Sequence, residues 1–408
     1  MRHYTHCVSI PLDKESIDLA NEPRPIPWSH STDESNCYIN FYRSWIEASF
    51  QVTTSANTAA GEKILKLVKP HSCAISRIDG NFVFVSQDGN VLGSDFTEAL
   101  KNESYYRTAL DNCFCNAEKQ MLDDYCPQYL GQQNVSSNSA NSFDIEYKVN
   151  TVASTTNTIK VRIPIRLLSG FAARESFLLV KNFQAKIYFN SWKYWISSAA
   201  NAGLDSKTIT AVKLVGLDSY YDQTVVDQGE DPFPESLLTI PQCKLESAVT
   251  PVVAKNGSVN GSETRIKFTD TINFKPKLMV LWFTHENDNT DSIKKISPTF
   301  FKISTGSETN TNCSLDPDSR GDTPDYRLWC ESRNCLDMNN SPVLRYDIWK
   351  NVSRYYLFSF AENFSLVNNS NYINYELRFI HNADETVHIH RAYLLDYLHN
   401  SVVEEETF

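Results

Sequence analysis

Glycine is scarce in this chain, and the short motifs that mark common enzyme classes are missing. Only 13 of the 408 residues are glycine, few for an enzyme of phosphate chemistry. The sequence has no GxxxxGK[ST] phosphate loop, no GxSxG nucleophile turn, no HExxH pair and no CxxC pair. These absences favour a chain that is not an enzyme and holds no cofactor.

Long apolar runs are missing as well. The longest, Leu278–Phe283, is far shorter than the roughly 20 residues that cross a bilayer. The first 19 residues carry three acidic side chains and no apolar segment of signal-peptide type. We therefore expect a chain made in the cytosol, with no transmembrane segment. Its ten cysteines are expected to be reduced core residues rather than disulfides.

The chain also lacks an excess of positive charge. Its 38 Lys and Arg residues against 49 Asp and Glu residues give a net charge of −11. A general nucleic-acid binder needs cations to displace counterions from phosphates, so we expect no sequence-specific nucleic-acid partner. Hydrophobic content of 41% is ample for globular cores, and the length favours two domains.

What the sequence does contain is alternation of apolar and polar residues. Period two predicts half-buried strands, and no stretch of comparable strength has the period of a helix. The only convincing helical region is 95–125. The chain is therefore predicted to be all-β with one helical insertion in its first half. The alternating apolar residues are Ile159, Val161, Ile163, Ile165 and Leu167; Phe183, Ala185, Ile187 and Phe189; Ile266, Phe268, Ile272 and Phe274; and Ile373, Tyr375, Leu377 and Phe379.

Proline and turn residues suggest how the strands are divided. Residues 1–30 contain four prolines and few patterned apolar positions, which predicts an extended N-terminal arm. Four further prolines within 230–251 predict a linker, so the two domains are placed at 31–245 and 246–408. Each is long enough for one eight-stranded jelly roll.

Two smaller features complete this division. Asp79-Gly80 and Asp88-Gly89 bracket the apolar residues 82–85, and Asp-Gly is a strong hairpin-turn signal. A polar segment at 305–325 is predicted to be a loop within the second domain.

Three groups of segments, in matching order and spacing, resemble a known family. They are Arg77–Gly93 with Ser104–Leu110; Arg162–Phe171 with Phe177–Phe189 and Leu238–Pro241, the last resembling the closing strand of a first jelly roll; and Pro276–Phe283 with Tyr375–Tyr397. The resemblance is to the double-jelly-roll major capsid proteins of Polinton/Maverick elements, adintoviruses and virophages, in the adenovirus-hexon-like lineage. Two departures are Ala109-Leu110-Asp111, where an acidic residue is expected sooner after Arg107, and Lys277, where arginine is usual.

The resemblance implies two consecutive eight-stranded antiparallel jelly rolls and a structural function. Such a protein forms a homotrimer, a pseudo-hexagonal capsomer, which contacts neighbouring capsomers and penton or minor capsid proteins. Together they form an icosahedral shell around a DNA genome. The implied location is the virion, after synthesis in the host cytoplasm and assembly in the cytoplasm or nucleus. The alternative from fold-level evidence is a jelly-roll carbohydrate-binding module or glycan-processing enzyme.

Candidate site residues are few. Arg320-Gly321-Asp322 is the tripeptide that integrin ligands display on loops, and Asp316, Asp318 and Asp322 loosely resemble a calcium loop. The favoured interpretation of both is a solvated loop tip.

Two other motifs have ligand-type side chains. His388-Ile389-His390 places two imidazoles on one strand face, where packing against neighbouring subunits is favoured over metal binding. Cys113-Phe114-Cys115 has poor geometry for zinc, so no metal is expected. Aromatic clusters at 192–195 and 355–360 are expected to pack in cores and interfaces rather than form carbohydrate platforms. A glycosidase would also need two inward-facing carboxylates, and no such pair stands out.

Overall fold

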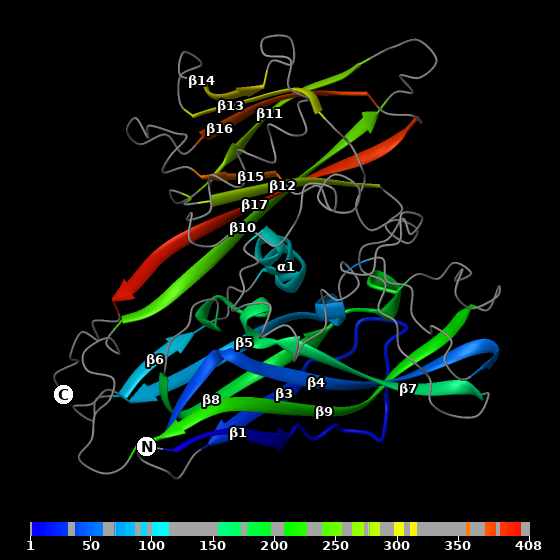
Figure 1. The fold of residues 1–408 in the computed structure, drawn as a ribbon, viewed down its shortest axis with the longest axis vertical. Helices are drawn as coiled ribbons and strands as arrows, with labels where there is room; N and C mark the ends of the chain where they lie inside the picture. Colours follow the sequence, from blue (N-terminus) through cyan, green and yellow to red (C-terminus); the bar gives the residue numbers. More distant parts are fainter. Residues whose placement is uncertain are drawn as a thin grey trace.

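The computed structural model consists of two jelly rolls, the first at the bottom of Figure 1 and the second at the top. It describes residues 2–31, 37–59, 69, 71–85, 91–95, 100–113, 154–172, 178–196, 208–226, 239–254, 263–272, 276, 278–285, 298–305, 311–315, 356–359, 372–380 and 384–400.

The first roll holds nine strands and an α-helix. The strands are β1 (Arg2–Ser9), β2 (Ile17–Asp18), β3 (Ile26–Ser31), β4 (Cys37–Thr58), β5 (Ile75–Val85), β6 (Val91–Asp95), β7 (Ser154–Pro164), β8 (Leu178–Phe189) and β9 (Ile209–Val225). The helix α1 (Glu103–Cys113) lies between β6 and β7, and four short 3₁₀ helices are η1 (His71–Ala74), η2 (Ile165–Leu167), η3 (Gly170–Ala172) and η4 (Trp192–Tyr194).

These strands form two antiparallel ladders. One has the order β1-β9-β4-β7, with β2 continuing the line of β1 along β9, and the other has the order β3-β8-β5-β6. A short pairing of Tyr38 and Ile39 with Leu179 and Leu178 joins the ladders. With β1 and β2 counted as one interrupted strand, the roll has eight strands.

The second roll repeats this topology. Its sheets have the orders β10-β17-β12-β15 and β11-β16-β13-β14. In both rolls one sheet contains the first, last, third and sixth strands, and the other contains the second, seventh, fourth and fifth. This is the double jelly roll expected from the sequence. The strands are β10 (Thr239–Ala254), β11 (Thr264–Thr271), β12 (Leu278–His285), β13 (Pro298–Thr305), β14 (Thr311–Leu315), β15 (Tyr356–Ser359), β16 (Tyr372–Phe379) and β17 (Glu385–Asn400).

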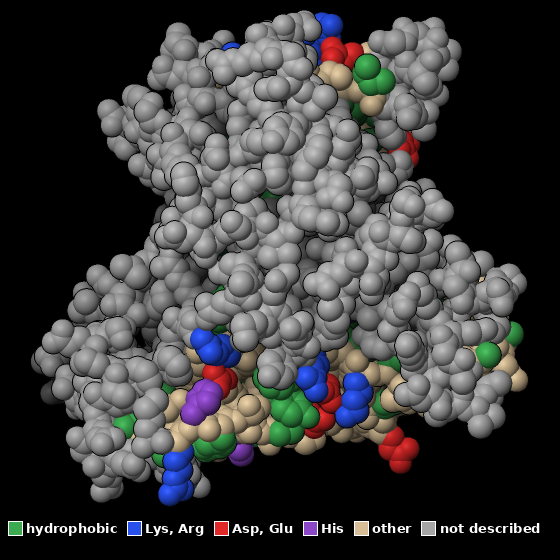
Figure 2. Space-filling view, viewed as in Figure 1, with side chains coloured by type: hydrophobic (Ala, Val, Ile, Leu, Met, Phe, Trp, Pro, Cys, Tyr) green, Lys and Arg blue, Asp and Glu red, His purple; other side chains and the backbone are tan. Residues whose placement is uncertain are grey.

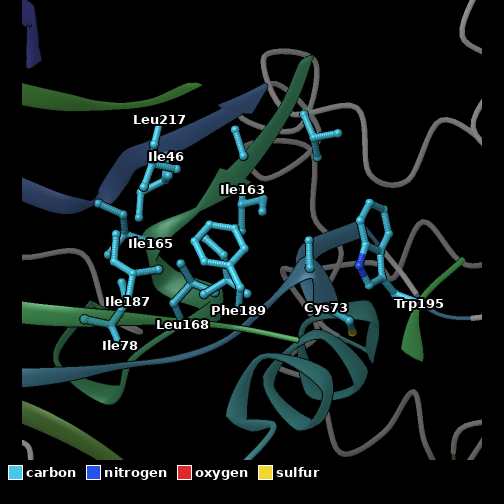
Figure 3. Packing of buried hydrophobic residues seen from close by; sticks show 14 of the residues in the cluster. Ile46, Cys73, Ile78, Ile163, Ile165, Leu168, Ile187, Phe189, Trp195 and Leu217 are labelled. Atoms are coloured by element: carbon cyan, nitrogen blue, oxygen red, sulfur yellow. The ribbon is translucent and has the colours of Figure 1, made fainter. Parts of the chain in front are cut away.

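The alternating stretches form strands whose apolar side chains enter the cores. Ile159, Val161 and Ile163 of β7 are buried, but the strand ends at Pro164 and the next residues form η2. The apolar residues of β8 and β16 are buried as predicted, whereas Ile266 and Phe268 of β11 are only partly buried against the second core. Figure 3 shows side chains from β4, β7, β8 and β9, among them Ile46, Ile163, Ile187 and Leu217, meeting inside the first roll.

The predicted N-terminal arm is wrong. Residues 2–31 form β1, β2 and β3, which pair with β9 and β8. Trp28 is 1% exposed, and its indole Nε1 donates a hydrogen bond to the Tyr221 hydroxyl at 2.8 Å. Of the four prolines only Pro27 lies within a strand, and β3 is an edge strand among the described residues, where a missing N–H need not remove a ladder hydrogen bond. The first roll therefore begins near residue 2 rather than at 31.

The predicted linker also needs correction. Residues 239–254 form β10, which pairs along its whole length with β17. Leu238–Pro241 therefore leads into the opening strand of the second roll rather than closing the first. The division between 245 and 246 falls inside β10, so the boundary belongs before Thr239.

Two predicted turns or loops contain strand instead. Asp79-Gly80 lies within β5, while Asp88-Gly89 lies outside the described residues. A Cβ added to Gly80 would lie 2.4 Å from the Cα of Ala185, so glycine is required there for close approach of β5 and β8. In the polar segment 305–325, residues 311–315 form β14. Of the helical region 95–125, the structure describes α1.

Candidate functional site

The contact between the two rolls is the most elaborate polar and aromatic arrangement among the described residues. The helix α1 extends from the first roll and lies between the rolls, against the sheet that contains β10, β12 and β17 (Figure 1). Val280, Trp282 and Ala392 of that sheet belong to the same buried cluster as the core of the first roll. The rolls therefore share one continuous apolar core.

Local hydrogen bonds fix the start of α1. Asn102 precedes the helix with φ 60°, a left-handed conformation that asparagine tolerates better than most residues. Its N–H donates to Ser76 Oγ at 3.0 Å, and its carbonyl accepts from the N–H of Tyr105. Within the helix, Arg107 Nε donates to Glu103 Oε1 at 2.6 Å, one turn away and buried. These bonds anchor the helix to β5 and orient Tyr105 and Tyr106 towards the second roll.

Two tyrosines of α1 cover an aromatic pair of the second roll. Trp282 of β12 and His390 of β17 stand opposite each other in the ladder, with ring centroids 5.2 Å apart and planes 9° apart. The Tyr105 and Tyr106 ring centroids each lie 5.6 Å from that of Trp282. Trp282 Nε1 donates to the Tyr105 hydroxyl at 2.9 Å. The contact therefore combines burial of large rings with a satisfied polar group.

His390 is a packed, neutral histidine. Burial is the main cause that lowers its pKa to about 3, and the charges of the neighbouring His388, Lys69 and Arg391 contribute to that shift. Its Nε2 lies 2.7 Å from Thr284 Oγ1. The structure thus places it against α1 of its own chain, not against a neighbouring subunit as the sequence suggested. Because the ring stays neutral in the folded state, it does not charge at mildly acidic pH.

A second polar network stabilises the interior of the second roll. Arg391 is 1% exposed, and its Nε and Nη2 donate to Asp270 Oδ2 and Oδ1 at 2.8 and 2.7 Å. The hydroxyl of Tyr393 also bonds to Asp270, and it lies 2.6 Å from that of Tyr375. Burial raises the pKa of both tyrosines well above the usual value. The fork of two parallel bonds is the geometry expected of a structural ion pair.

The outward face of the sheet β1-β9-β4-β7 carries a further polar and aromatic group. Trp45 of β4 stacks on Tyr220 of β9, with centroids 5.1 Å apart and planes 8° apart. Beside them Glu47 accepts hydrogen bonds from Lys160 Nζ at 2.9 Å and Arg162 Nε at 3.1 Å. Burial opposes ionisation of Glu47, but these two bonds outweigh it and lower its pKa. Figure 2 shows hydrophobic, basic and acidic side chains interspersed on the lower part of the first roll.

The buried carboxylates of the described residues each contact a basic side chain. Glu47 contacts Lys160 and Arg162, Glu103 contacts Arg107, and Asp222 lies 3.0 Å from His3 Nε2. They come from separate elements, β4, α1 and β9, and their basic partners are different side chains. These are structural ion pairs rather than the two facing carboxylates of a glycosidase.

Several sequence candidates lie inside the cores. Trp192 and Trp195 are 3% and 0% exposed, and Tyr356 is 1% exposed, so these rings cannot form a carbohydrate platform. Cys37 and Cys73 are buried as expected, whereas Cys7 is exposed. Arg320, Gly321 and Asp322 lie outside the described residues, as do Phe114 and Cys115 of the Cys113–Cys115 motif.

Neither a metal cluster nor a spanning helix occurs in the part of the chain that the structure describes. No three His, Cys, Asp or Glu side chains there are grouped so that they could hold a metal ion. Among the same residues, no helix has the length and apolarity to cross a membrane. An open hollow of about 700 Å³ lies beside β2 and β3, and its lining mixes Asp13 and Asp18 with Lys14, Arg24 and Lys213. This mixture of charges does not favour one class of ligand.

Sequence reasoning missed the two tryptophan pairs. The Trp45 pair could have been located from the alternation of its strand. Ser44, Ile46 and Ala48 face the core, so Trp45 must lie on the opposite face. A large ring on a face that is not the core of its own roll suggests an interface. Nothing in the sequence indicated which residues would cover it.

Comparisons with known proteins identify the fold. No protein-family model and no curated protein matches the sequence. Among solved structures, the cryo-EM structure of the Sputnik virophage matches with a TM-score of 0.58 and 9% identity, covering 96% of this chain and 85% of that one. The mavirus major capsid protein matches with a TM-score of 0.54 and 10% identity, covering 96% and 87%.

A third structure, PBCV-1 VP54 fitted into a reconstruction of Sputnik, matches with a TM-score of 0.50 and 10% identity, covering 98% and 97%. Each of these matches covers 96% or more of this chain and therefore includes both rolls. The chain therefore has the fold of the double-jelly-roll major capsid proteins.

Proposed function

We infer that this chain is a structural protein, the major capsid protein of a virion with a DNA genome, and not an enzyme. The observation that carries the inference is the tandem of two jelly rolls with identical strand order, joined through a shared buried core. The mavirus major capsid protein, which has this fold, matches 96% of the chain. Because each chain supplies two similar rolls, three copies supply the six rolls of a pseudo-hexagonal tile.

The partners follow from this role. The chain assembles with itself into a homotrimer, the trimers contact neighbouring capsomers in an icosahedral shell, and penton or minor capsid proteins occupy the remaining positions. Synthesis is in the host cytoplasm, assembly takes place in the cytoplasm or the nucleus, and the final location is the virion. The genome is enclosed without sequence-specific recognition, in keeping with the net charge of −11.

The test is the oligomer of the purified full chain. Light scattering at micromolar concentration should give the mass of a trimer, and negative-stain images should show a pseudo-hexagonal outline. A chain that stays monomeric under these conditions would contradict the proposal.

Arg320-Gly321-Asp322 is proposed to be a solvated loop tip rather than a receptor site. Asp322→Glu keeps the charge but changes the length of the side chain that integrin-type recognition depends on. Attachment of assembled particles to cells should be unchanged by this substitution. Loss of attachment with intact trimers would support a receptor site instead.

A further inference from the structure

The two ladders of the first roll meet at an edge formed by β1 and β3, which run along the same side of the roll (Figure 1). Among the described residues β1 is the outermost strand of one ladder and β3 is the outermost strand of the other. The described part of the chain contains no hydrogen-bonded ladder between these two strands. Side chains therefore close this edge.

Two histidines make the contact across the edge. His6 of β1 and His30 of β3 are half-buried, and their ring centroids lie 6.0 Å apart. His30 also packs against Tyr221 of β9 and Phe183 of β8, with centroid distances of 4.8 and 5.7 Å. On the same strand Trp28 is buried and donates its indole hydrogen bond to Tyr221. The His30 ring thus belongs to the aromatic packing that holds β3 on the roll.

This packing accommodates a neutral imidazole better than a charged one. In the charged form both ring nitrogens carry a proton, and His30 Nε2 is buried with no hydrogen-bond partner among the described residues. The groups that face His30 are Phe183 from β8, the ring of Tyr221 from β9 and His6 from β1. Burial is the main cause that lowers the pKa of His30 to about 4, and the charge of His6 contributes to that shift.

A third histidine responds to protonation in the opposite way. His3 lies on the other face of β1 from His6, and its Nε2 is 3.0 Å from Asp222 Oδ1 of β9. A proton on His3 strengthens its contact with this carboxylate and so attaches β1 more firmly to β9. Asp222 follows Tyr221 in β9 and faces the opposite side of the strand, so its carboxylate does not compensate a charge on His30. Acid therefore acts against β3 and not against β1.

We propose that His6 and His30 form an acid-sensitive clasp, whose protonation favours a form of the chain in which β3 is released while β1 stays paired with β9. The inference goes beyond the capsid function and does not depend on it, because the contacts lie within one folded chain.

The pH range follows from the shift at His30. Its pKa is lowered from 6.5 to about 4, so the stability of the clasp is fully present above pH 6.5 and is lost as the pH falls towards 4. The difference of about 2.5 between the two values corresponds to a rise of up to about 300-fold in the population with β3 released. About 100-fold of that rise is reached between pH 7 and pH 4.

Hydrogen–deuterium exchange of the purified full chain, followed by mass spectrometry at pH 7 and pH 4, measures this population. After division by the intrinsic exchange rate at each pH, the exchange of the amides in 26–31 should rise about 100-fold. The amides of β4 and β9, the central strands of the other ladder, should rise much less. A parallel rise in all three strands would show that acid unfolds the whole roll and would overturn the proposal. So would an unchanged β3.

Three variants assign the effect to the two histidines. His30→Gln keeps a polar side chain that cannot charge, and it should reduce the rise at β3 to less than about 10-fold. His6→Gln should also reduce the rise, by a smaller factor, because the charge of His6 is the lesser cause of the shift. His3→Gln is the matched control, since it makes the same change on the other face of β1 and should leave the rise at β3 at about 100-fold.

The His6 variant keeps the test decisive if His30→Gln does not fold. A rise at β3 as large as in the wild type, in either His30→Gln or His6→Gln, would overturn the proposal. A rise that His3→Gln abolishes would likewise show that the ion pair with Asp222, and not the clasp, responds to acid.

Discussion

Replacing Tyr105 with phenylalanine removes one atom from the contact between the rolls. The Tyr105 hydroxyl accepts the hydrogen bond from Trp282 Nε1 at 2.9 Å, and Trp282 is fully buried. Without that hydroxyl the indole N–H loses this acceptor in an apolar environment, where an unsatisfied donor costs about 1–3 kcal/mol. The ring itself remains, so packing against Trp282 and His390 is kept. We expect Tyr105→Phe to lower the free energy of unfolding by that amount.

Urea unfolding, followed by circular dichroism, measures the effect. Tyr372→Phe is the control, because a surface change of this kind stays within about 0.5 kcal/mol of the wild type. Trp282→Phe removes the donor instead, so the double variant should cost about 1 kcal/mol less than the sum of the single variants. A Tyr105→Phe protein as stable as the control, or strict additivity in the double variant, would refute the reasoning.

Three further predictions concern the rest of the fold. Deleting residues 1–31 should abolish soluble expression, because it removes two sheet edges and the buried Trp28; a soluble truncated chain with native circular dichroism would contradict this. Asp270→Ala should lower the free energy of unfolding by about 3–5 kcal/mol, since it leaves the Arg391 charge buried without its partner, and Asp270→Glu should recover part of that loss. Burial lowers the pKa of His390 to about 3, so its contribution to stability is fully present above the unfolded pKa of about 6.5 and is lost as the pH falls from there towards 3. His390→Gln should therefore reduce the slope of unfolding free energy against pH between 6 and 4 by about one proton, and an unchanged slope would show that His390 does not titrate in this way.

The sequence alone determined the strands that have a strong alternation and which side of each of them would be buried. In β16, for example, Ile373, Tyr375, Leu377 and Phe379 are all buried, as their alternation predicted. Period two is a local property, since each strand needs an apolar face whatever its neighbours are. The all-β class, the tandem arrangement and the resemblance to double-jelly-roll proteins were therefore accessible from the residues.

Where the local pattern is weak, tertiary contacts determined whether a segment forms a strand. The strand β1 is exposed along most of its length, and β10 contains Pro241 and Pro251, so neither reads as a strand in isolation. Each pairs with one strand more than about 130 positions away, β9 and β17 respectively. Edge strands tolerate proline and polar residues because only one of their two hydrogen-bonding sides is used.

The contact between the rolls was also determined by tertiary structure rather than by local sequence. Tyr105 and Trp282 are 177 positions apart, and the hydrogen bond between them depends on how α1 is anchored to β5. Alternation in β4 places Trp45 on the face away from the core of its own roll, whereas the unbroken apolar run 278–283 does not indicate the face on which Trp282 lies. Which ring would cover each tryptophan depends on the relative placement of whole sheets, and no local periodicity encodes that placement.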